Sequence, residues 1–320
     1  MLAAVLVVLA VSGAYAAVHV TAGQPASAPR SPSATVGPAS ARSGDGANPS
    51  TAAVLPTAGP TAFPAPVGSG LSPGSSLMPS PVPTLAPLVP IGFTLRVPIL
   101  MYHLIATPAE SVGALPGLVV SPALFDAQLA RLEAAGWHTI TLRALAADLG
   151  THRRPAPRSF VITIDDGHVD GYTEAFPILR RHAMVATYFV IAGRIGHPGD
   201  LDADQLRALA AAGMEIGDHS MDHVDLTAVA PAELAIEVGG AAAVIGSVVG
   251  TAPVSFAYPF GEFDAAVMRG VARAGLLLAV TERFGAVEAA NLRYEIPRVR
   301  VGPGTTPAVL LATLSQWSGR

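Results

Sequence analysis

The sequence predicts an α/β fold in which parallel strands form a barrel. Over the last 230 residues or so, short apolar segments alternate with amphipathic helical segments, and this alternation is typical of a parallel sheet with helical crossovers. Polar residues that suit hydrolytic chemistry directly follow two of the apolar segments. In barrels of this kind the active site lies at the carboxyl ends of the strands.

The predicted strands are apolar runs rich in β-branched and aromatic residues. They cover residues 97–102, 160–164, 186–191, 214–216, 254–258 and 276–281.

Three helices are predicted from the residues that mark their ends. Ser121-Pro122 starts one that ends at Gly136, and Asp202 starts another that ends at Gly213. Pro231 starts a longer, alanine-rich helix.

The first 90 residues have a different composition. Residues 2–18 form an apolar run without charge, and residues 21–90 hold 15 of the 29 prolines with only Arg30, Arg42 and Asp45 charged. Such a composition cannot build a hydrophobic core, so we expect a disordered tether rich in Pro, Ala, Ser and Thr. The predicted division is therefore a leader over 1–20, a linker over 21–90 and one barrel-sized domain over 91–320.

The leader has two interpretations. Ala14-Tyr15-Ala16 has the pattern of a signal-peptide cleavage site, and the run of about 17 apolar residues over 2–18 also suits an uncleaved membrane anchor. The positive residues expected before either are missing. Both interpretations predict an extracytoplasmic protein, secreted or anchored at the cell surface. The long tether favours an anchored protein that works in a cell wall.

Composition limits the chemistry. The chain has no cysteine, so disulfides and thiolate ligands are excluded and a metal site would use nitrogen and oxygen. A formal net charge of -4 predicts no basic surface for nucleic acid.

Two carboxylates follow the predicted strand at 160–164. Neighbouring residues of a strand point to opposite faces, so Asp165 and Asp166 share a pocket only where the strand ends and bends. Gly167 permits that bend. By itself, Asp-Asp-Gly is usually an ordinary turn.

Two imidazoles follow the predicted strand at 214–216, four residues apart at His219 and His223. Two imidazoles and a carboxylate hold a divalent metal well and leave positions open for water and substrate. Such a metal lowers the pKa of its bound water to about 7, while a second carboxylate accepts the water's proton. The histidine spacing alone would also arise on a surface helix, but both motifs together predict a hydrolytic metal site.

From about Pro98 to Val301 the chain resembles the polysaccharide deacetylases of carbohydrate esterase family 4, also called the NodB homology domain. The motifs Thr163-Ile164-Asp165-Asp166-Gly167 and His219-Ser220-Met221-Asp222-His223 carry the resemblance in order and spacing. It implies a distorted (β/α) barrel in which Asp165 is the catalytic base. It also implies three metal ligands, which are Asp166, His219 and His223.

The family's third motif is matched in part by Ala257-Tyr258-Pro259-Phe260-Gly261. The family arginine that steers the base is replaced by Ala257. The resemblance implies that the Phe260 backbone N–H stabilises the oxyanion, a role that needs no particular side chain. Tyr258 is expected to contact the substrate.

The segment Val97-Pro98-Ile99-Leu100-Met101-Tyr102-His103 resembles the branch that includes the poly-N-acetylglucosamine deacetylases. There the elements are permuted and the Met-Tyr-His histidine is the general acid. No histidine follows His223, so the resemblance assigns the acid to His103. A satisfied core histidine is the alternative.

Two further residues belong to the expected substrate cleft. Arg298 lies in a segment, 296–301, that is also similar to that branch, and we expect it to supply the positive charge that Ala257 lacks. His168 directly follows Asp-Asp-Gly and is expected to line the sugar cleft, with no role at all as the alternative.

The predicted function is metal-dependent removal of N-acetyl groups from a polysaccharide that contains N-acetylglucosamine, with release of acetate. Zinc is the expected metal, with cobalt, nickel or manganese as alternatives. Two other functions stay open: an O-acetyl esterase of the xylan type, and a catalytically inactive carbohydrate-binding module of the same fold. The sequence does not specify the polysaccharide or the oligomeric state.

Overall fold

The computed structural model describes residues 93–107, 111, 113–286 and 288–317. The predicted leader and linker lie outside these residues, as do the division points at residues 20 and 90.

Seven parallel strands close into a barrel, which confirms the predicted fold class. Their order around the barrel is β2, β12, β10, β9, β8, β7 and β6, and β6 pairs back with β2. The strands are β2 (Ile99–Tyr102), β6 (Ser159–Ile164), β7 (Thr187–Val190), β8 (Glu215–Asp218), β9 (Ser255–Ala257), β10 (Leu278–Phe284) and β12 (Ile296–Arg300).

Short additional strands lie outside this ring. The strand β5 (His138–Thr139) pairs with β6 on the side away from the closure. Two further pairs are β1 (Thr94–Leu95) with β11 (Glu288–Ala289), and β3 (Leu104–Ile105) with β4 (Val119–Val120).

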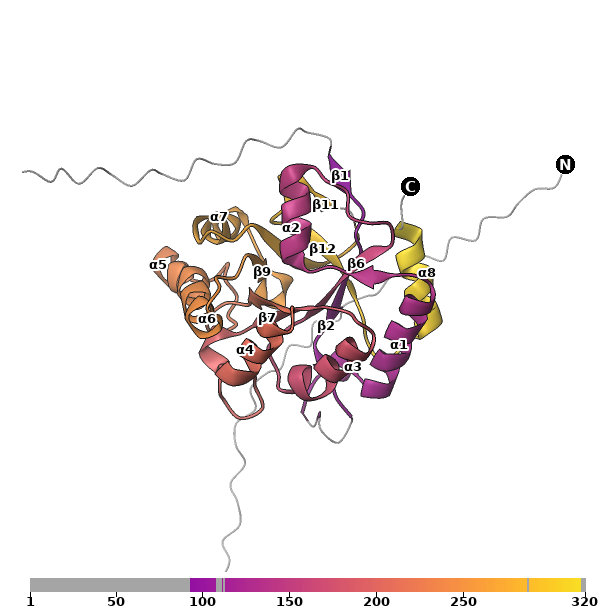
Figure 1. The fold of residues 1–320 in the computed structure, drawn as a ribbon. Helices are drawn as coiled ribbons and strands as arrows, with labels where there is room; N and C mark the ends of the chain where they lie inside the picture. Colours follow the sequence, from indigo (N-terminus) through magenta and orange to yellow (C-terminus); the bar gives the residue numbers. More distant parts are fainter. Residues whose placement is uncertain (1–92, 108–110, 112, 287, 318–320) are drawn as a thin grey trace, which may run out of the picture. The chain divides into compact units, whose positions relative to one another are not determined.

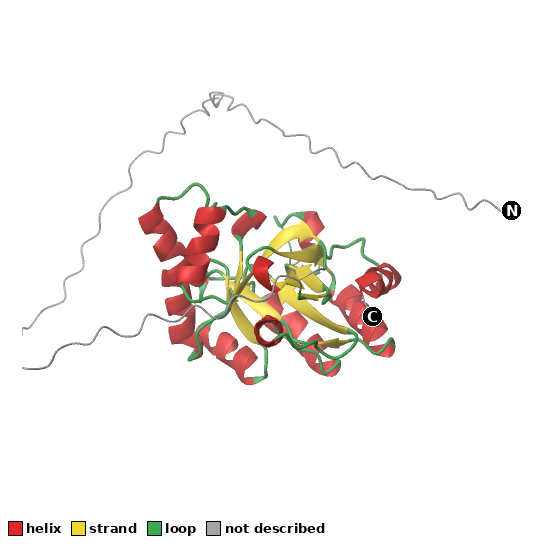
Figure 2. Cartoon of the chain, turned by 90° about the horizontal axis from the view of Figure 1, so that it is seen from above, coloured by secondary structure: helices red, strands yellow, loops and turns green. Residues whose placement is uncertain are grey.

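Helices surround the strands on the outside (Figures 1 and 2). The α-helices are α1 (Pro122–Ala134), α2 (Leu142–Thr151), α3 (Phe176–Arg181), α4 (Ala203–Ala211), α5 (Pro231–Ala235), α6 (Ala241–Val249), α7 (Ala265–Arg273) and α8 (Pro307–Trp317). Two π-helical turns, η2 (Gly171–Ala175) and η4 (Ile236–Gly240), precede α3 and α6, and short 3-10 turns are η1 (Pro116–Leu118), η3 (Ala192–Arg194), η5 (Pro259–Gly261) and η6 (Ala290–Leu292).

The predicted helix starts are confirmed by their caps. The Ser121 hydroxyl accepts a hydrogen bond from the Leu124 N–H at 3.2 Å, and Asp202 forms a capping box with Gln205. The helix that starts at Pro231 runs through α5, η4 and α6 to Val249. By length and composition this stretch could span a membrane, but it buries Val238, Ala241 and Ile245 in the core of the domain.

Most of the strand residues are buried on both faces, and β2, β6 and β7 are therefore mainly apolar. In β6, Phe160, Ile162 and Ile164 pack in the cluster that includes the helix residues of α1, α3 and α4. The intervening Val161 packs instead with Ile99 of β2.

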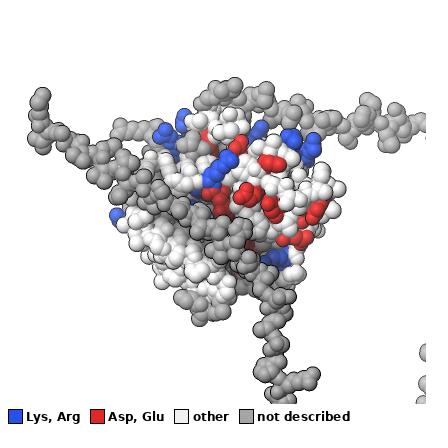
Figure 3. Space-filling view, turned by 180° about the vertical axis from the view of Figure 1, so that it is seen from behind, with Lys and Arg blue, Asp and Glu red and all other residues white. Residues whose placement is uncertain are grey.

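Charged side chains are distributed unevenly over the surface. On the face in Figure 3, acidic side chains gather toward the middle and arginines lie mainly nearer the edge of the described part. The arginines therefore form no continuous patch on the visible described surface.

Candidate active site

Polar side chains gather at the carboxyl ends of the barrel strands. His103 follows β2, Asp165 and Asp166 follow β6, and His219 follows β8. Parallel strands bring these ends to the same rim of the barrel, so residues more than 100 positions apart in the chain meet there.

The three predicted metal ligands converge. The Nε2 atoms of His219 and His223 lie 3.4 and 3.6 Å from Asp166 Oδ1, and the candidate ligand atoms all lie within 4.8 Å of one another. His219 Nδ1 donates a hydrogen bond to the Ala257 carbonyl at 2.8 Å, which leaves its Nε2 lone pair directed at the cluster. This set of two nitrogens and one carboxylate oxygen fits a divalent metal such as zinc.

The electrostatics of the cluster suit metal binding. Burial raises the pKa of Asp166, but hydrogen bonds and charges from His168, His219 and His103 outweigh it and hold that pKa well below its usual range. Burial and the neighbouring His219 lower the pKa of His223 to about 4. A ligating carboxylate must be ionised and a ligating imidazole unprotonated, and the shifts of Asp166 and His223 favour these states. Burial lowers the pKa of His219, but its hydrogen bond to Asp166 and the charges of Asp165 and Asp166 raise that pKa above its ordinary value.

The backbone of the site is held in a rarely occupied conformation. Asp166, Ser220, His223 and Phe260 have positive φ angles of 76°, 69°, 55° and 58°, a region that residues other than glycine seldom adopt. Such angles persist only where the surroundings fix them. Here the Ser220 hydroxyl accepts a hydrogen bond from the His223 N–H at 2.9 Å.

A second support for the histidine loop comes from buried carboxylates. Asp218 Oδ1 accepts from the Ser220 N–H at 2.9 Å. Glu237 Oε2, from η4, accepts from the N–H groups of Met221 and Asp222 at 3.2 and 3.1 Å. No sequence motif indicates the role of Glu237, because it lies in a helix with ordinary helical composition.

The predicted base, Asp165, is buried against Arg298. The guanidinium NH1 group of Arg298 donates to Asp165 Oδ1 at 2.8 Å and to Thr163 Oγ1 at 3.0 Å. Arg298 Nε donates to the Thr281 carbonyl at 3.0 Å. Burial raises the pKa of Asp165, but Arg298, His103 and His219 outweigh burial and place that pKa below its ordinary value.

Arg298 therefore lies beneath the base and away from solvent. Its side chain is 1% exposed, so the expected direct contact with substrate is not supported. The positive charge beside Asp165 therefore comes from Arg298 of β12, and not from the position of Ala257.

The predicted acid, His103, lies on the other side of the base. Its Nε2 is 3.9 Å from Asp165 Oδ2. Burial lowers the pKa of His103 below its ordinary value, and the charges of Asp165 and Asp166 offset this effect only in part.

The third motif places Phe260 beside the histidines but turns Tyr258 away. The Phe260 ring is exposed and lies 4.6 Å from the His223 ring, centroid to centroid. The Tyr258 side chain is buried, stacks on Phe263 at 4.8 Å and donates its hydroxyl proton to the Tyr294 carbonyl at 2.9 Å. The expected substrate contact of the Tyr258 side chain is therefore not supported, because alternation along the chain directs it into the outer core with α7.

His168 lies at the edge of the cluster. Its Nε2 is 3.7 Å from Asp166 Oδ2 and its Nδ1 is 3.2 Å from Asp200 Oδ1. Burial lowers the pKa of His168, and Asp166, Asp170 and Asp200 together raise it above its ordinary value. Nothing in the sequence pointed to Asp200, which is 32 residues away in a loop.

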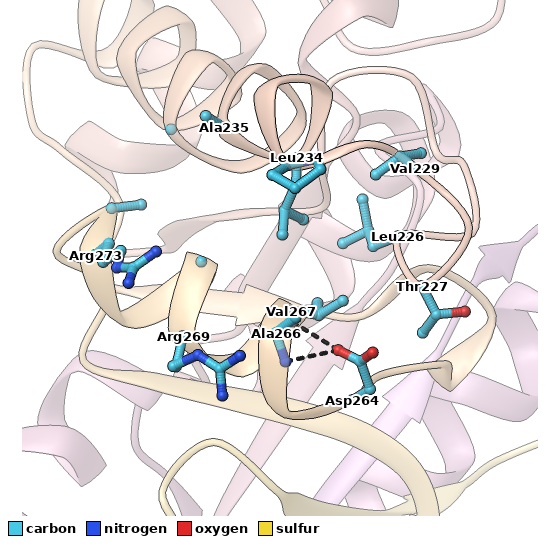
Figure 4. Close-up of a pocket in the computed structure, with 14 residues that line it drawn as sticks. Leu226, Thr227, Val229, Leu234, Ala235, Asp264, Ala266, Val267, Arg269 and Arg273 are labelled. Carbon is cyan, nitrogen blue, oxygen red and sulfur yellow. Dashed lines mark hydrogen bonds between the residues drawn. The ribbon is translucent and has the colours of Figure 1, made fainter.

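Two hollows were compared as substrate sites. One of about 310 Å³ adjoins Asp166 and His168 and is otherwise lined by Leu104, Ser111, Ala114, Leu115 and Leu118. Another of about 440 Å³ lies between α5, η4 and α7, with Arg269 and Arg273 at its side (Figure 4). Its lining includes no histidine, and its single carboxylate, Asp264, caps α7. Only the first hollow adjoins groups that suit hydrolysis.

Comparisons with known proteins agree with this arrangement. Residues 152–279 match the family model described as polysaccharide deacetylase. The chain is 29% identical over 209 residues, 65% of its length, to 72% of YxkH of Bacillus subtilis, a protein named as a polysaccharide deacetylase. It is 34% identical over 121 residues, 37% of its length, to 53% of a chitooligosaccharide deacetylase of a Bradyrhizobium strain.

Solved structures show the same fold. The deacetylase PplD of Streptococcus pyogenes, solved in complex with acetate, is similar with a TM-score of 0.64 and 28% identity, over 69% of this chain and 98% of that one. IcaB of Ammonifex degensii has a TM-score of 0.60 at 23% identity, over 70% of this chain and 97% of that one. At 23% identity, the similarity to IcaB shows a shared fold and no more.

Proposed function

Because the chain belongs to the polysaccharide deacetylase family, we propose that it is a metal-dependent hydrolase that removes N-acetyl groups from a polysaccharide containing N-acetylglucosamine. The observation that carries the proposal is the convergence of Asp166, His219 and His223 beside a second, buried carboxylate. Zinc is the proposed metal, with cobalt, nickel or manganese as alternatives.

Asp166, His219 and His223 would hold the metal, which when bound polarises the acetyl carbonyl and lowers the pKa of a water molecule. The hydrogen bond from His219 Nδ1 to the Ala257 carbonyl orients one imidazole for this role. A carbonyl needs no side chain, so Ala257 serves here although the family motif has arginine at this position.

Asp165 would act as the general base. It is buried, and the guanidinium of Arg298 at 2.8 Å keeps it ionised and fixes one of its oxygens. The other oxygen is left to accept the proton of the attacking water. Arg298 would therefore position and ionise the base without contacting the substrate.

His103 would act as the general acid. When protonated, it would donate its proton to the departing amine. The distance of 3.9 Å between His103 Nε2 and Asp165 Oδ2 supports this pairing of roles. The Phe260 N–H would donate a hydrogen bond to the substrate oxyanion. Acetate and a glucosamine residue are the products.

The relatives support a carbohydrate substrate. One is named a chitooligosaccharide deacetylase, which favours an N-acetylated sugar over the alternatives of an O-acetyl ester or a non-catalytic binding module. The proposed location stays as the sequence predicts it: outside the cytoplasm, with residues 1–20 as signal or anchor, residues 21–90 as linker, and the catalytic domain over 91–320.

The test is acetate release by the purified protein from N-acetylglucosamine oligomers, peptidoglycan and acetylated xylan, with Asp165→Asn as the inactive control. Release from the first two that stops on chelation and returns with metal supports the proposal. Release from xylan alone indicates an esterase. No release by protein that still binds metal indicates a binding module.

A further inference from the structure

His168 connects the candidate metal ligand Asp166 to an ion pair between the buried Asp200 and the half-exposed Arg194. The ring has a carboxylate at each nitrogen, with Asp166 Oδ2 3.7 Å from Nε2 and Asp200 Oδ1 3.2 Å from Nδ1. The second oxygen of Asp200 accepts a hydrogen bond from Arg194 Nε at 2.9 Å. The side chains thus form the series Arg194, Asp200, His168 and Asp166, which ends at the metal site.

Asp200, which holds one side of the His168 ring, is itself held in place. The Asp200 side chain is 2% exposed, and Arg194 compensates its charge. The backbone ties the two loops together, because Val169 N–H donates to the Gly199 carbonyl and Leu201 N–H donates to the Gly167 carbonyl, each at 2.9 Å. Asp200 can therefore hold the imidazole in one orientation.

The outer end of the series is where orientation matters. The two oxygens of Asp166 face different imidazoles. Its Oδ1 lies 3.4 and 3.6 Å from His219 and His223, whereas its Oδ2 faces His168. The backbone of Asp166 has φ = 76°, a conformation that only its surroundings can hold. A group that occupies Oδ2 keeps Oδ1 directed at the histidines.

We propose that His168 is a positioning residue for the metal ligand Asp166, and that Asp200 with Arg194 orients it for this role. The inference rests on the proposed metal-dependent function and replaces the expectation that His168 serves only to line the sugar cleft. Groups that orient the ligands of a metal typically contribute about tenfold to 100-fold to its affinity.

The experiment measures Zn²⁺ affinity of the whole protein after metal removal, by competition with a chromophoric chelator. His168→Phe keeps a planar ring without nitrogens and is expected to weaken Zn²⁺ binding by about tenfold to 100-fold. Asp200→Asn should weaken binding in the same direction. The double variant should lose less than the sum of the two, because both changes act through one contact. The visible absorption of Co²⁺-loaded protein should also change, since it reports the geometry of the ligands.

A matched control is His182→Phe. His182 also lies between two carboxylates, with Glu133 Oε2 2.6 Å from Nδ1 and Asp126 Oδ1 3.0 Å from Nε2, but it belongs to the α1 and α3 region and not to the metal cluster. Its loss should leave Zn²⁺ affinity and the Co²⁺ spectrum unchanged. His168→Gln, which keeps one N–H donor, serves if His168→Phe does not fold.

The outcomes separate this inference from the proposed function. Unchanged Zn²⁺ affinity in the His168 variants, with a raised KM for substrate, would overturn the positioning role and leave a substrate contact. Failure of the unaltered protein to bind any divalent metal would overturn the proposed function as well.

Discussion

Replacing Arg298 by methionine tests the arrangement of the base most directly. Methionine fills much of the same space but removes the guanidinium that is hydrogen-bonded to Asp165, Thr163 and the Thr281 carbonyl. The side chain is 1% exposed and that of Asp165 is 2% exposed, so no solvent replaces the lost partner. Removing one partner of such a buried pair costs about 3–5 kcal/mol of unfolding free energy.

The destabilisation by Arg298→Met should change with pH in a definite direction. In the unaltered protein the pKa of Asp165 lies below its ordinary value of 3.8, so this carboxylate contributes stability above that pH, which is lost as pH falls through the lower folded value. Without Arg298, burial is the largest effect, and the folded pKa of Asp165 should rise. The ionised carboxylate then destabilises the variant increasingly as pH rises above 3.8. The difference in stability between the two proteins should therefore be smallest near pH 4 and largest near pH 7.

The assay is urea denaturation followed by circular dichroism across that pH range. The matched control is Arg298→Met in the background of Asp165→Asn, where the loss should be smaller because no charge remains to be compensated. A loss below about 1 kcal/mol that does not vary with pH would refute the inference that Arg298 serves the base.

Three further predictions follow from single sites. Asp166→Ala should abolish Zn²⁺ binding, whereas Asp165→Asn should retain it and lose most turnover; equilibrium dialysis and acetate release separate the two, and equal effects on both would contradict the assigned roles. Gly217→Ala should cost about 1–3 kcal/mol, because a Cβ there would lie 2.7 Å from the Phe189 ring and 2.8 Å from Ser255 Oγ; Gly150→Ala, with nothing within 4 Å, is the urea-denaturation control. Glu288, buried in β11, has its pKa raised by burial from 4.5 to about 8, so its favourable contribution is present below pH 4.5 and is lost as pH rises toward 8. The stability of Glu288→Gln relative to that of the unaltered protein should therefore be greater at pH 8 than at pH 4.5. Parallel profiles of stability against pH for the two proteins would contradict this.

The barrel could be predicted because most of its strands are apolar on both faces. The segments at β2, β6, β7, β9 and β10 stand out for that reason, whereas β8 (Glu215–Asp218) was predicted only over residues 214–216. The strand β12 was missed, since Pro297, Arg298 and Arg300 interrupt its apolar pattern. Arg298 points inward and pairs with the buried Asp165, so a charged residue occupies a position that the apolar pattern of packing cannot predict.

The cluster of candidate metal ligands could be predicted because each of its two motifs is short and follows a strand, but the groups that support this cluster could not. Ala257 and Tyr258 are adjacent in a matched motif, yet Ala257 packs inside the barrel and Tyr258 packs against α7. A motif gives the position of a residue in the chain, whereas the direction of its side chain depends on the pleat of the strand. The contact between His168 and Asp200 forms where two loops meet, and no local sequence pattern predicts such a meeting.

The closure of the barrel has a consequence for how the protein is made. The first strand of the barrel, β2, is paired on one side with the last strand, β12, and the two ends bring His103 and Arg298 to the same base. A chain still lacking β12 would expose unpaired edges on both β2 and β10, which are sites for pairing with other chains. It would also hold Asp165 without its cation. The candidate site is therefore complete only once β12 has joined the barrel, because β12 carries Arg298.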